Sequence, residues 1–137
     1  MTRIFSTQTL LGLEKALEGT ALRHRVIANN IANVDTPGYK RMEVYFEEEL
    51  QRALSGNGIA GRRTHPAHLK IGSADPASVT PTVVTDPSTS YRLDGNNVDI
   101  DIEMARLAKN TLLYNALVQE VAAELGRLRT AITEGRK

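Results

Sequence analysis

Two histidines in a loop-like stretch are the first residues whose spacing could support chemistry. His65 and His68 form a His-x-x-His pair, a spacing at which two imidazoles can share a metal ion. No third ligand stands nearby, and Arg62 and Arg63 precede the pair, where their charge would repel a cation. The better interpretation is a solvated loop, so no metal site is predicted.

The acidic stretch "DGNNVDIDIE" (residues 94–103) resembles a calcium loop at first sight. Such a loop needs oxygen ligands at its positions 1, 3 and 5 and glycine at position 6. Positions 5 and 6 are Val98 and Asp99 here, so the pattern fails. The stretch instead predicts the start of a helix, with Asn97 or Asp99 as the capping residue and acidic side chains at the positive end of the helix dipole.

The remaining chemistry-bearing residues do not form a catalytic set. His24, between two arginines, could titrate near neutral pH, but it has no evident general-base partner. Glu47, Glu48 and Glu49 most simply form a solvated face. The absence of cysteine removes disulfides and thiolate catalysis. We therefore predict neither an enzyme nor a cofactor nor a small-molecule substrate.

The overall charge points the same way. Lys and Arg number 17 against 16 Asp and Glu, a net charge of +1, which argues against a nucleic-acid binder. Aromatic residues are 4% of the chain, so thin seams of aliphatic side chains must supply the packing. The first 19 residues hold no long apolar run and no small-residue cleavage site, so no cleaved signal peptide is predicted. No window is apolar enough to span a membrane.

Two long helices dominate the pattern along the chain. The first is predicted from near residues 6–9 to Asp35, and the last begins near Asn97–Asp99. Apolar residues in both recur at 3-4 spacing, the mark of a heptad seam. The N-terminal seam includes Leu10, Leu13, Leu17, Ile27 and Ile31. The C-terminal seam includes Met104, Leu107, Tyr114, Val118, Val121, Leu125 and Leu128.

The predicted fold class is mainly α, with the two terminal helices pairing as an elongated, coiled-coil-like antiparallel hairpin. The segments are an N-terminal seam helix (1–35), a turn and short amphipathic helix (36–55), a loop-rich middle segment (56–97) and the C-terminal seam helix (98–137). Short strands are possible at 69–71, 79–85 and 91–93. Both seams are wider than one partner helix can cover, which predicts further packing against other chains.

The end of the first helix carries an unusual set of amides. Asn29, Asn30 and Asn33 stand just before Thr36-Pro37-Gly38-Tyr39, which fits a type II turn with proline second and glycine third. Asparagine is a mediocre helix former, so an amide face that bonds to a neighbouring chain would explain all three. The alternative, a helix-end cap by Asn33, explains one of them.

The stretch "ANNIANVDTPGYKR" (residues 28–41) resembles the N-terminal signature of bacterial flagellar rod and hook proteins. The C-terminal "GNNVDIDIEMARLAKNTLLYNALVQEVAAELGRLRTAI" is similar to the terminal helix of that family. The resemblance covers about the first 55 and last 45 residues. The short length and the run "AKNTLLYNALVQ" favour the proximal-rod members over the larger distal-rod and hook members.

The resemblance implies a structural subunit of the flagellar basal body. Such subunits cross the inner membrane through the flagellar type III export apparatus without signal cleavage. They then stack helically into a hollow periplasmic shaft that carries torque from the motor ring to the hook, and their terminal helices order on assembly. The implied partners are further copies, other rod subunits, and basal-body proteins near the motor ring and export gate. The alternative is a cytoplasmic helical-hairpin adaptor or chaperone for amphipathic helices, which would leave the asparagine-rich turn unexplained.

Overall fold

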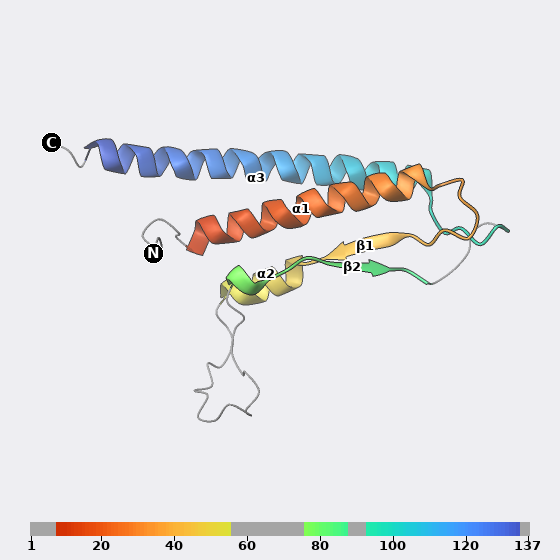
Figure 1. Ribbon diagram of the computed structural model, residues 1–137. Coiled ribbons are helices and arrows are strands. Elements are labelled where there is room, and N and C mark those ends of the chain that lie inside the picture. The colour runs from red at the N-terminus through yellow and green to blue at the C-terminus, as the bar shows by residue number, and fades with distance from the viewer. Residues whose placement is uncertain (1–7, 56–75, 88–92, 135–137) are drawn as a thin grey trace, which may run out of the picture.

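The computed structural model describes residues 8–55, 76–87 and 93–134. Two long helices, α1 (Gln8–Ala32) and α3 (Ile100–Glu134), lie side by side in opposite directions (Figure 1). The direction follows from cross-helix bonds, since Asn30 meets Glu103 while Thr20, earlier in α1, meets Asn110, later in α3. The predicted mainly α fold with paired terminal helices is confirmed.

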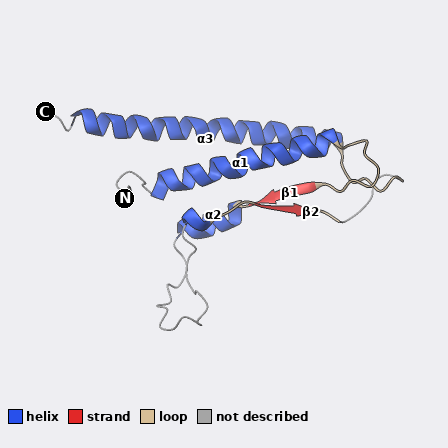
Figure 2. Cartoon of the chain, viewed as in Figure 1, coloured by secondary structure: helices blue, strands red, loops and turns tan. Residues whose placement is uncertain are grey.

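Helix α1 lies in the middle of three layers. One side contacts α3, and the other contacts strand β1 (Met42–Tyr45), helix α2 (Glu47–Ser55) and a short 3-10 turn, η1 (Pro76–Ser78). Strand β1 pairs antiparallel with β2 (Thr82–Thr85), as Figure 2 shows. We call the layer of β1, β2, α2 and η1 the second layer. The small apolar core sits between α1 and the second layer, and consists of Val26, Val44, Phe46, Leu50, Ala53 and Val79.

A glycine lets the second layer approach α1 closely. A Cβ placed on Gly19 would lie 2.5 Å from the Phe46 ring, a distance that no relaxed side chain tolerates. Arg23, one turn further on, covers the same ring with its guanidinium 5.0 Å from the centroid. Phe46 is therefore enclosed between a bare stretch of helix and a cation.

The segment after the turn differs from its predicted form. A single amphipathic helix was expected there, because Met42, Phe46 and Leu50 recur at helical spacing. The expectation is wrong for residues 42–45, which form β1. The backbone N–H and C=O of Met42 both bond to the side chain of Asn30, and the other edge of β1 pairs with β2. A helix would supply neither partner. Only Glu47–Ser55 is helical.

Strand β2 falls within one of the three stretches where a strand was thought possible, 79–85. The stretch 69–71, most of 91–93, and the pair His65 and His68 lie outside the described residues. Helix α3 begins with the predicted cap, because Asp99 Oδ1 accepts from Asp101 N at 2.9 Å and from Ile102 N at 3.2 Å. In the described ranges no helix is long and apolar enough to cross a membrane.

Candidate assembly interface and the network that positions it

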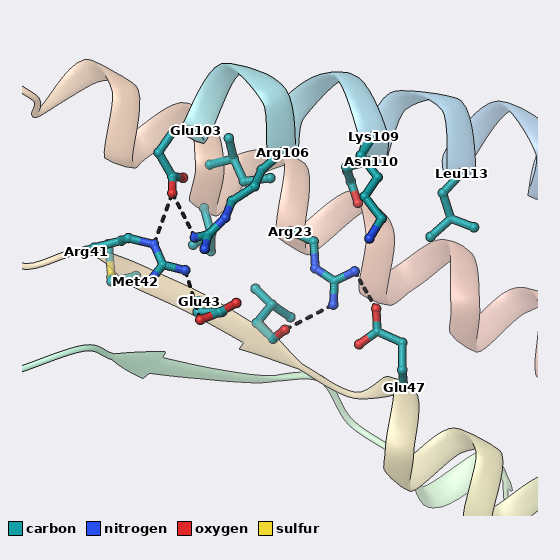
Figure 3. Close-up of a pocket in the computed structure, with 13 residues that line it drawn as sticks. Arg23, Arg41, Met42, Glu43, Glu47, Glu103, Arg106, Lys109, Asn110 and Leu113 are labelled. Atoms are coloured by element: carbon teal, nitrogen blue, oxygen red, sulfur yellow. Dashed lines mark hydrogen bonds and ion pairs between the residues drawn. The ribbon is translucent and has the colours of Figure 1, made fainter. Parts of the chain in front are cut away.

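A buried carboxylate joins the two long helices where the chain turns back. Glu103, 1% exposed, accepts from Asn30 Nδ2, Arg41 Nε and Arg106 Nη1, each at 3.0 Å. Figure 3 shows the bonds from Arg41 and Arg106. These donors come from α1, from the segment after the turn, and from α3 itself. Since a buried charge is tolerated only with partners of this kind, Glu103 fixes all three segments relative to one another.

Asn30 supplies the second half of this connection and has no exposed surface. Its Nδ2 also donates to Met42 O at 2.8 Å, and its Oδ1 accepts from Met42 N at 3.0 Å and from Tyr39 Oη at 3.2 Å. The amide thus pairs with β1 as a neighbouring strand would. The expectation that Asn30 bonds to another chain is corrected: its amide is fully used within its own chain.

Two further asparagines close the same end of the helix pair. Asn96 Nδ2 lies 3.0, 2.9 and 2.9 Å from the carbonyl oxygens of Asn33, Val34 and Thr36, in the segment that follows α1. Asn97 Oδ1 accepts from the backbone N of Arg41 at 2.7 Å. We call Asn30, Arg41, Asn96, Asn97 and Glu103 the junction network.

The predicted turn lies against this network. Tyr39 N donates to Thr36 O at 3.3 Å and Gly38 has a φ of +71°, the geometry that a type II turn requires. Gly38 N donates to Asp94 O at 2.9 Å, which ties the turn to the segment before α3. Thr36, Pro37 and Gly38 are otherwise exposed.

The charges around the junction network set the protonation states of Arg41 and of the neighbouring Tyr39. Burial opposes the charge on Arg41, but hydrogen bonds and attraction from Glu43 and then Glu103 outweigh it, so the pKa of Arg41 is raised. Burial and the neighbouring Glu103 charge both raise the pKa of the Tyr39 hydroxyl. The tyrosine therefore stays a neutral hydrogen-bond donor to Asn30, and Arg41 stays a cation.

Further along the pair, the contact between helices is also polar. Asn110 Nδ2 donates to Thr20 O at 3.0 Å, and Thr20 turns its hydroxyl back to Ala16 O at 2.9 Å. Asn110 and Glu103 are the only residues of α3 that are buried, among those described. Neither belongs to the predicted apolar seam, and sequence periodicity gave no reason to select them.

The predicted seam residues occupy two kinds of place. Ile27 is buried, and half-buried positions hold Leu10, Leu13, Leu17, Ile31, Leu107, Val121 and Leu128. Exposed positions hold Met104, Tyr114, Val118 and Leu125. The α3 seam is therefore split: one edge lies along α1, and the other faces away from the chain's own core.

The amide pair Asn29 and Asn33 differs from Asn30. Asn29 is exposed, and Asn33 Nδ2 donates to Asn29 O at 2.8 Å, one helical turn back. Thr36 Oγ1 also donates to Asn33 Oδ1 at 3.2 Å. Asn33 therefore helps to end the helix locally, which was the alternative interpretation for that residue.

The opposite end of the helix pair is apolar and open. A groove there is lined mainly by Leu10 of α1 and by Leu125, Leu128 and Ile132 of α3. Leu125 and Ile132 are 54% and 60% exposed. We call these four residues the open groove.

No catalytic or metal-binding constellation is found in the ranges that the structure describes. No group of three His, Cys, Asp or Glu side chains there could hold a metal ion. His24 is exposed. Glu47, Glu48 and Glu49 are exposed as expected for a solvated face, and Glu47 also pairs with Arg23. The arrangement can hold helices in register and present apolar surface.

Comparison with known proteins gives this arrangement a family. Residues 13–40, which cover most of α1 and the turn, match the family model described as "Flagella basal body rod protein". The chain is 37% identical over 128 residues to the flagellar basal body rod protein FlgB of Bacillus subtilis, covering 93% of this chain and 95% of the relative. It therefore belongs to the flagellar basal-body rod protein family.

Other relatives carry the same name. FlgB of Borrelia hermsii is 41% identical over 106 residues, with 72% of this chain and 76% of the relative covered. FlgB of Proteus mirabilis is 29% identical over 128 residues, with 89% and 91% covered. Within the family the chain is thus FlgB-like, and a structural rod subunit is favoured over a helix-binding adaptor.

Proposed function

We propose that this chain is a structural subunit of the proximal part of the flagellar rod. Copies stack helically into the periplasmic shaft that transmits torque from the motor ring to the hook. The role is mechanical and uses no catalytic group or cofactor. Its family membership and its FlgB relatives support the rod assignment.

The observation that carries the proposal is how little of α3 is covered by the rest of the chain. This helix has 35 residues, yet its two described buried residues are both polar, Glu103 and Asn110. Nine of its large apolar side chains stand at least 40% exposed: Ile100, Ile102, Met104, Leu112, Leu113, Tyr114, Val118, Leu125 and Ile132. At about 25 cal/mol per Å² of apolar surface, covering such a helix is a strong drive for association. A subunit that packs against copies of itself on several sides has this surface.

The proposed partners follow from the place in the shaft. They are further copies of this chain, other rod subunits, and the basal-body proteins next to the motor ring and export gate. The flagellar type III export apparatus delivers the subunit to the periplasm without signal cleavage. The interface comprises the exposed edge of α3, the open groove, and Asn29 at the end of α1.

A charge placed in the exposed seam tests the proposal. Val118 is 42% exposed, so Val118→Asp leaves the isolated fold intact. On assembly the carboxylate is buried without a partner, which costs several kcal/mol and recurs in every copy. We expect the variant to be absent from purified basal bodies while the wild-type chain is present.

The matched control is Glu120→Gln, an exposed position on the same helix. Export is measured separately in both strains, so that loss of delivery is distinguished from loss of assembly. Normal incorporation of exported Val118→Asp would show that this edge of α3 is not an assembly surface. Absence of the wild-type chain from basal bodies would refute the rod function itself.

A further inference from the structure

The two edges of the β1–β2 sheet are finished differently. On the edge of β1 that faces α1, Met42 N and Met42 O both bond to the Asn30 side chain. Further along the same edge, Val44 O accepts from Arg23 Nη2 at 3.1 Å. Strand β2 lies on the side of β1 away from the two long helices, as Figures 1 and 3 show. Strand β1 therefore has partners on both edges, whereas β2 has a partner strand on one edge only.

The free edge of β2 presents backbone groups from two residues. The 2.8 Å bond from Asp86 N to Arg41 O sets the phase of the antiparallel ladder. Bonded and non-bonded pairs alternate along such a ladder, so Val84 bonds to β1 while Val83 and Thr85 direct their N–H and C=O groups away from it. Among the residues that the structure describes, neither Val83 nor Thr85 has a hydrogen-bond partner on that side. We call the outward backbone groups of these two residues the β2 edge.

No side chain of β2 blocks a further strand. Exposed edges are usually protected by charged side chains, proline or a covering element, because they otherwise pair with other chains. Residues Thr82–Thr85 are all exposed and uncharged, and Val83 and Val84 are 42% and 45% exposed. Threonine and valine also favour extended backbone. Since a two-stranded sheet is only marginally stable by itself, a third strand at the β2 edge would stabilise it.

We propose that the β2 edge binds β2 of a second copy of the chain, with the two strands antiparallel and Val84 at the centre of the contact. Both edges of β1 are occupied, so among the described strands only β2 offers a free edge to another copy. Around a two-fold axis at Val84, Val83 of each copy lies opposite Thr85 of the other. These residues then exchange bonds as hydrogen-bonded pairs, and every group of the β2 edge gains a partner.

Prolines on both sides of β2 select this register. Pro81 and Pro87 have no N–H group, so they cannot donate to a neighbouring strand. Moving the centre of the contact by one or two residues in either direction places one of these prolines opposite Val83 or Thr85. Only the register centred on Val84 gives both residues a partner that can donate and accept.

The side chains that meet in this register are compatible. Each Val84 covers part of the exposed Val84 of the other copy. Asp86 lies opposite Thr82, whose hydroxyl can donate to a carboxylate. Like charges directly opposite each other would destabilise the pairing, and this register contains none.

The symmetry of the contact separates it from the shaft. An isologous contact closes after two copies, so it cannot extend into a stack. The pair therefore belongs to the free chain, and the inference does not rest on the proposed rod function. A contact limited to one short strand from each copy is weak and reversible. It hides the β2 edge from wrong partners and still lets the copies separate before assembly.

Disulfide trapping of the purified full-length chain tests the contact, since the natural chain has no cysteine. At a non-bonded antiparallel pair the Cα atoms are about 4.5 Å apart, within the range of a disulfide. We expect Val84→Cys to give a cross-linked dimer on mild oxidation. Thr82→Cys is exposed on the same strand but would lie about 13 Å from its own copy, so it should give about tenfold less dimer.

Charge exchange at the two-fold axis tests self-pairing by a second route. In Val84→Lys, and likewise in Val84→Glu, two like charges would meet, so we expect dimer formation in sedimentation velocity to fall by about tenfold or more. An equal mixture of the two variants should recover the dimer, because lysine then faces glutamate. Thr85→Pro removes one outward N–H and no bond to β1, so it should weaken the dimer as well. Circular dichroism of each variant checks that the fold is retained.

The outcomes identify what occupies the β2 edge. A second copy is the wrong occupant if Val84→Cys cross-links no faster than Thr82→Cys, or if both charge variants associate as the wild type does. Because the pair is not a shaft contact, Val84→Lys should enter purified basal bodies normally. If Val84→Lys is lost from basal bodies while the free wild-type chain stays monomeric, an extended segment of another basal-body protein occupies the edge instead. Absence of the wild-type chain from basal bodies would refute the rod function and leave the cross-linked dimer as evidence for this inference.

Discussion

The two ends of the helix pair are built from the same two helices by opposite means. At the turn end, the junction network holds α1 and α3 through a buried carboxylate, an arginine and three asparagines. At the other end, the open groove presents leucines and an isoleucine that α1 and α3 do not cover. Polar bonds have strict geometry and fix one register, whereas apolar contact is non-directional and can be completed by any fitting neighbour. The chain sets its own shape at one end and leaves the other for partners.

The largest expected effect comes from removing the buried charge at the turn end. Glu103→Gln takes the counterion from Arg106 and one of those of Arg41, so we expect the free energy of unfolding to fall by about 3 kcal/mol. Urea unfolding of the purified chain, followed by helical circular dichroism, measures it. Glu120→Gln, toward the open end, should change stability by no more than about 0.5 kcal/mol. Equal effects at the two sites would erase the contrast.

Neighbouring asparagines sharpen the contrast within a single helix. Asn30→Ala leaves the Met42 backbone groups and Glu103 short of buried partners, so we expect a loss of about 2–3 kcal/mol. Asn29→Ala changes an exposed side chain and should gain a few tenths of a kcal/mol from better helix propensity. Thermal unfolding of both variants is the measurement. A similar small effect for both would mean that Asn30 does not hold β1.

Two helical glycines make a matched pair across the molecule. An added Cβ at Gly19 would meet the Phe46 ring, so Gly19→Ala should destabilise by about 1–3 kcal/mol through overpacking. Gly126 lies near the open end with nothing within 4 Å, so Gly126→Ala should stabilise by about 1 kcal/mol. Urea unfolding of both variants is the measurement. We expect the midpoint to fall for Gly19→Ala and to rise for Gly126→Ala. A destabilised Gly126→Ala chain would show that this stretch of α3 is more crowded than the structure has it.

At the open end, stability and assembly should separate. Leu125 is 54% exposed, so Leu125→Asp should alter the stability of the free chain by no more than about 0.5 kcal/mol. The same change should remove the chain from basal bodies, because assembly would bury an unpaired carboxylate. Leu125→Met, which keeps the apolar surface, should incorporate normally. If Leu125→Asp incorporates as well as wild type, the open groove is not an interface.

The smallest expected effect is a pH dependence at the second layer. Burial raises the pKa of Glu47, but hydrogen bonds from Arg23 and from backbone N–H groups outweigh it, so the pKa lies below the usual 4.5. Its contribution to stability is therefore present above pH 4.5 and is lost as the pH falls through the lower folded value. Since the side chain is 52% exposed, Glu47→Gln should cost less than about 1 kcal/mol at pH 7. The difference from wild type should vanish in acid, and a difference that persists there would rule out the ion pair as its cause.

The parts of the fold that sequence could predict are those set by local rules. Heptad spacing located both long helices, and proline followed by glycine located the turn at residues 36–39. The carboxylate of Asp99 located the start of α3. Each of these signals lies within a few residues of the feature it specifies, so no knowledge of the rest of the chain is needed.

The parts that escaped prediction depend on residues far apart in the sequence. Residues 42–45 fit a helical pattern, and only their bonds to Asn30 and β2 make them a strand. Glu103 looked like one more acid in a first helical turn, and its burial depends on Arg41, 62 positions earlier. Within α1, the three asparagines look alike in sequence. Only the position of β1 makes Asn30 an internal residue while Asn29 stays exposed.

The pairing of the first long helix with the last has a consequence for how the chain folds as it is made. Asn30 and Glu103 are 73 positions apart, and Thr20 and Asn110 are 90 apart. During synthesis, α1 emerges long before α3 exists. The polar groups of α1 that bond to α3, and its apolar edge, therefore stay in solvent until the last third of the chain is complete. Such non-local closure is slower than the folding of a local helical hairpin, and the waiting helix is open to wrong associations. The step that limits folding is therefore expected to be the meeting of the two ends rather than the formation of either helix.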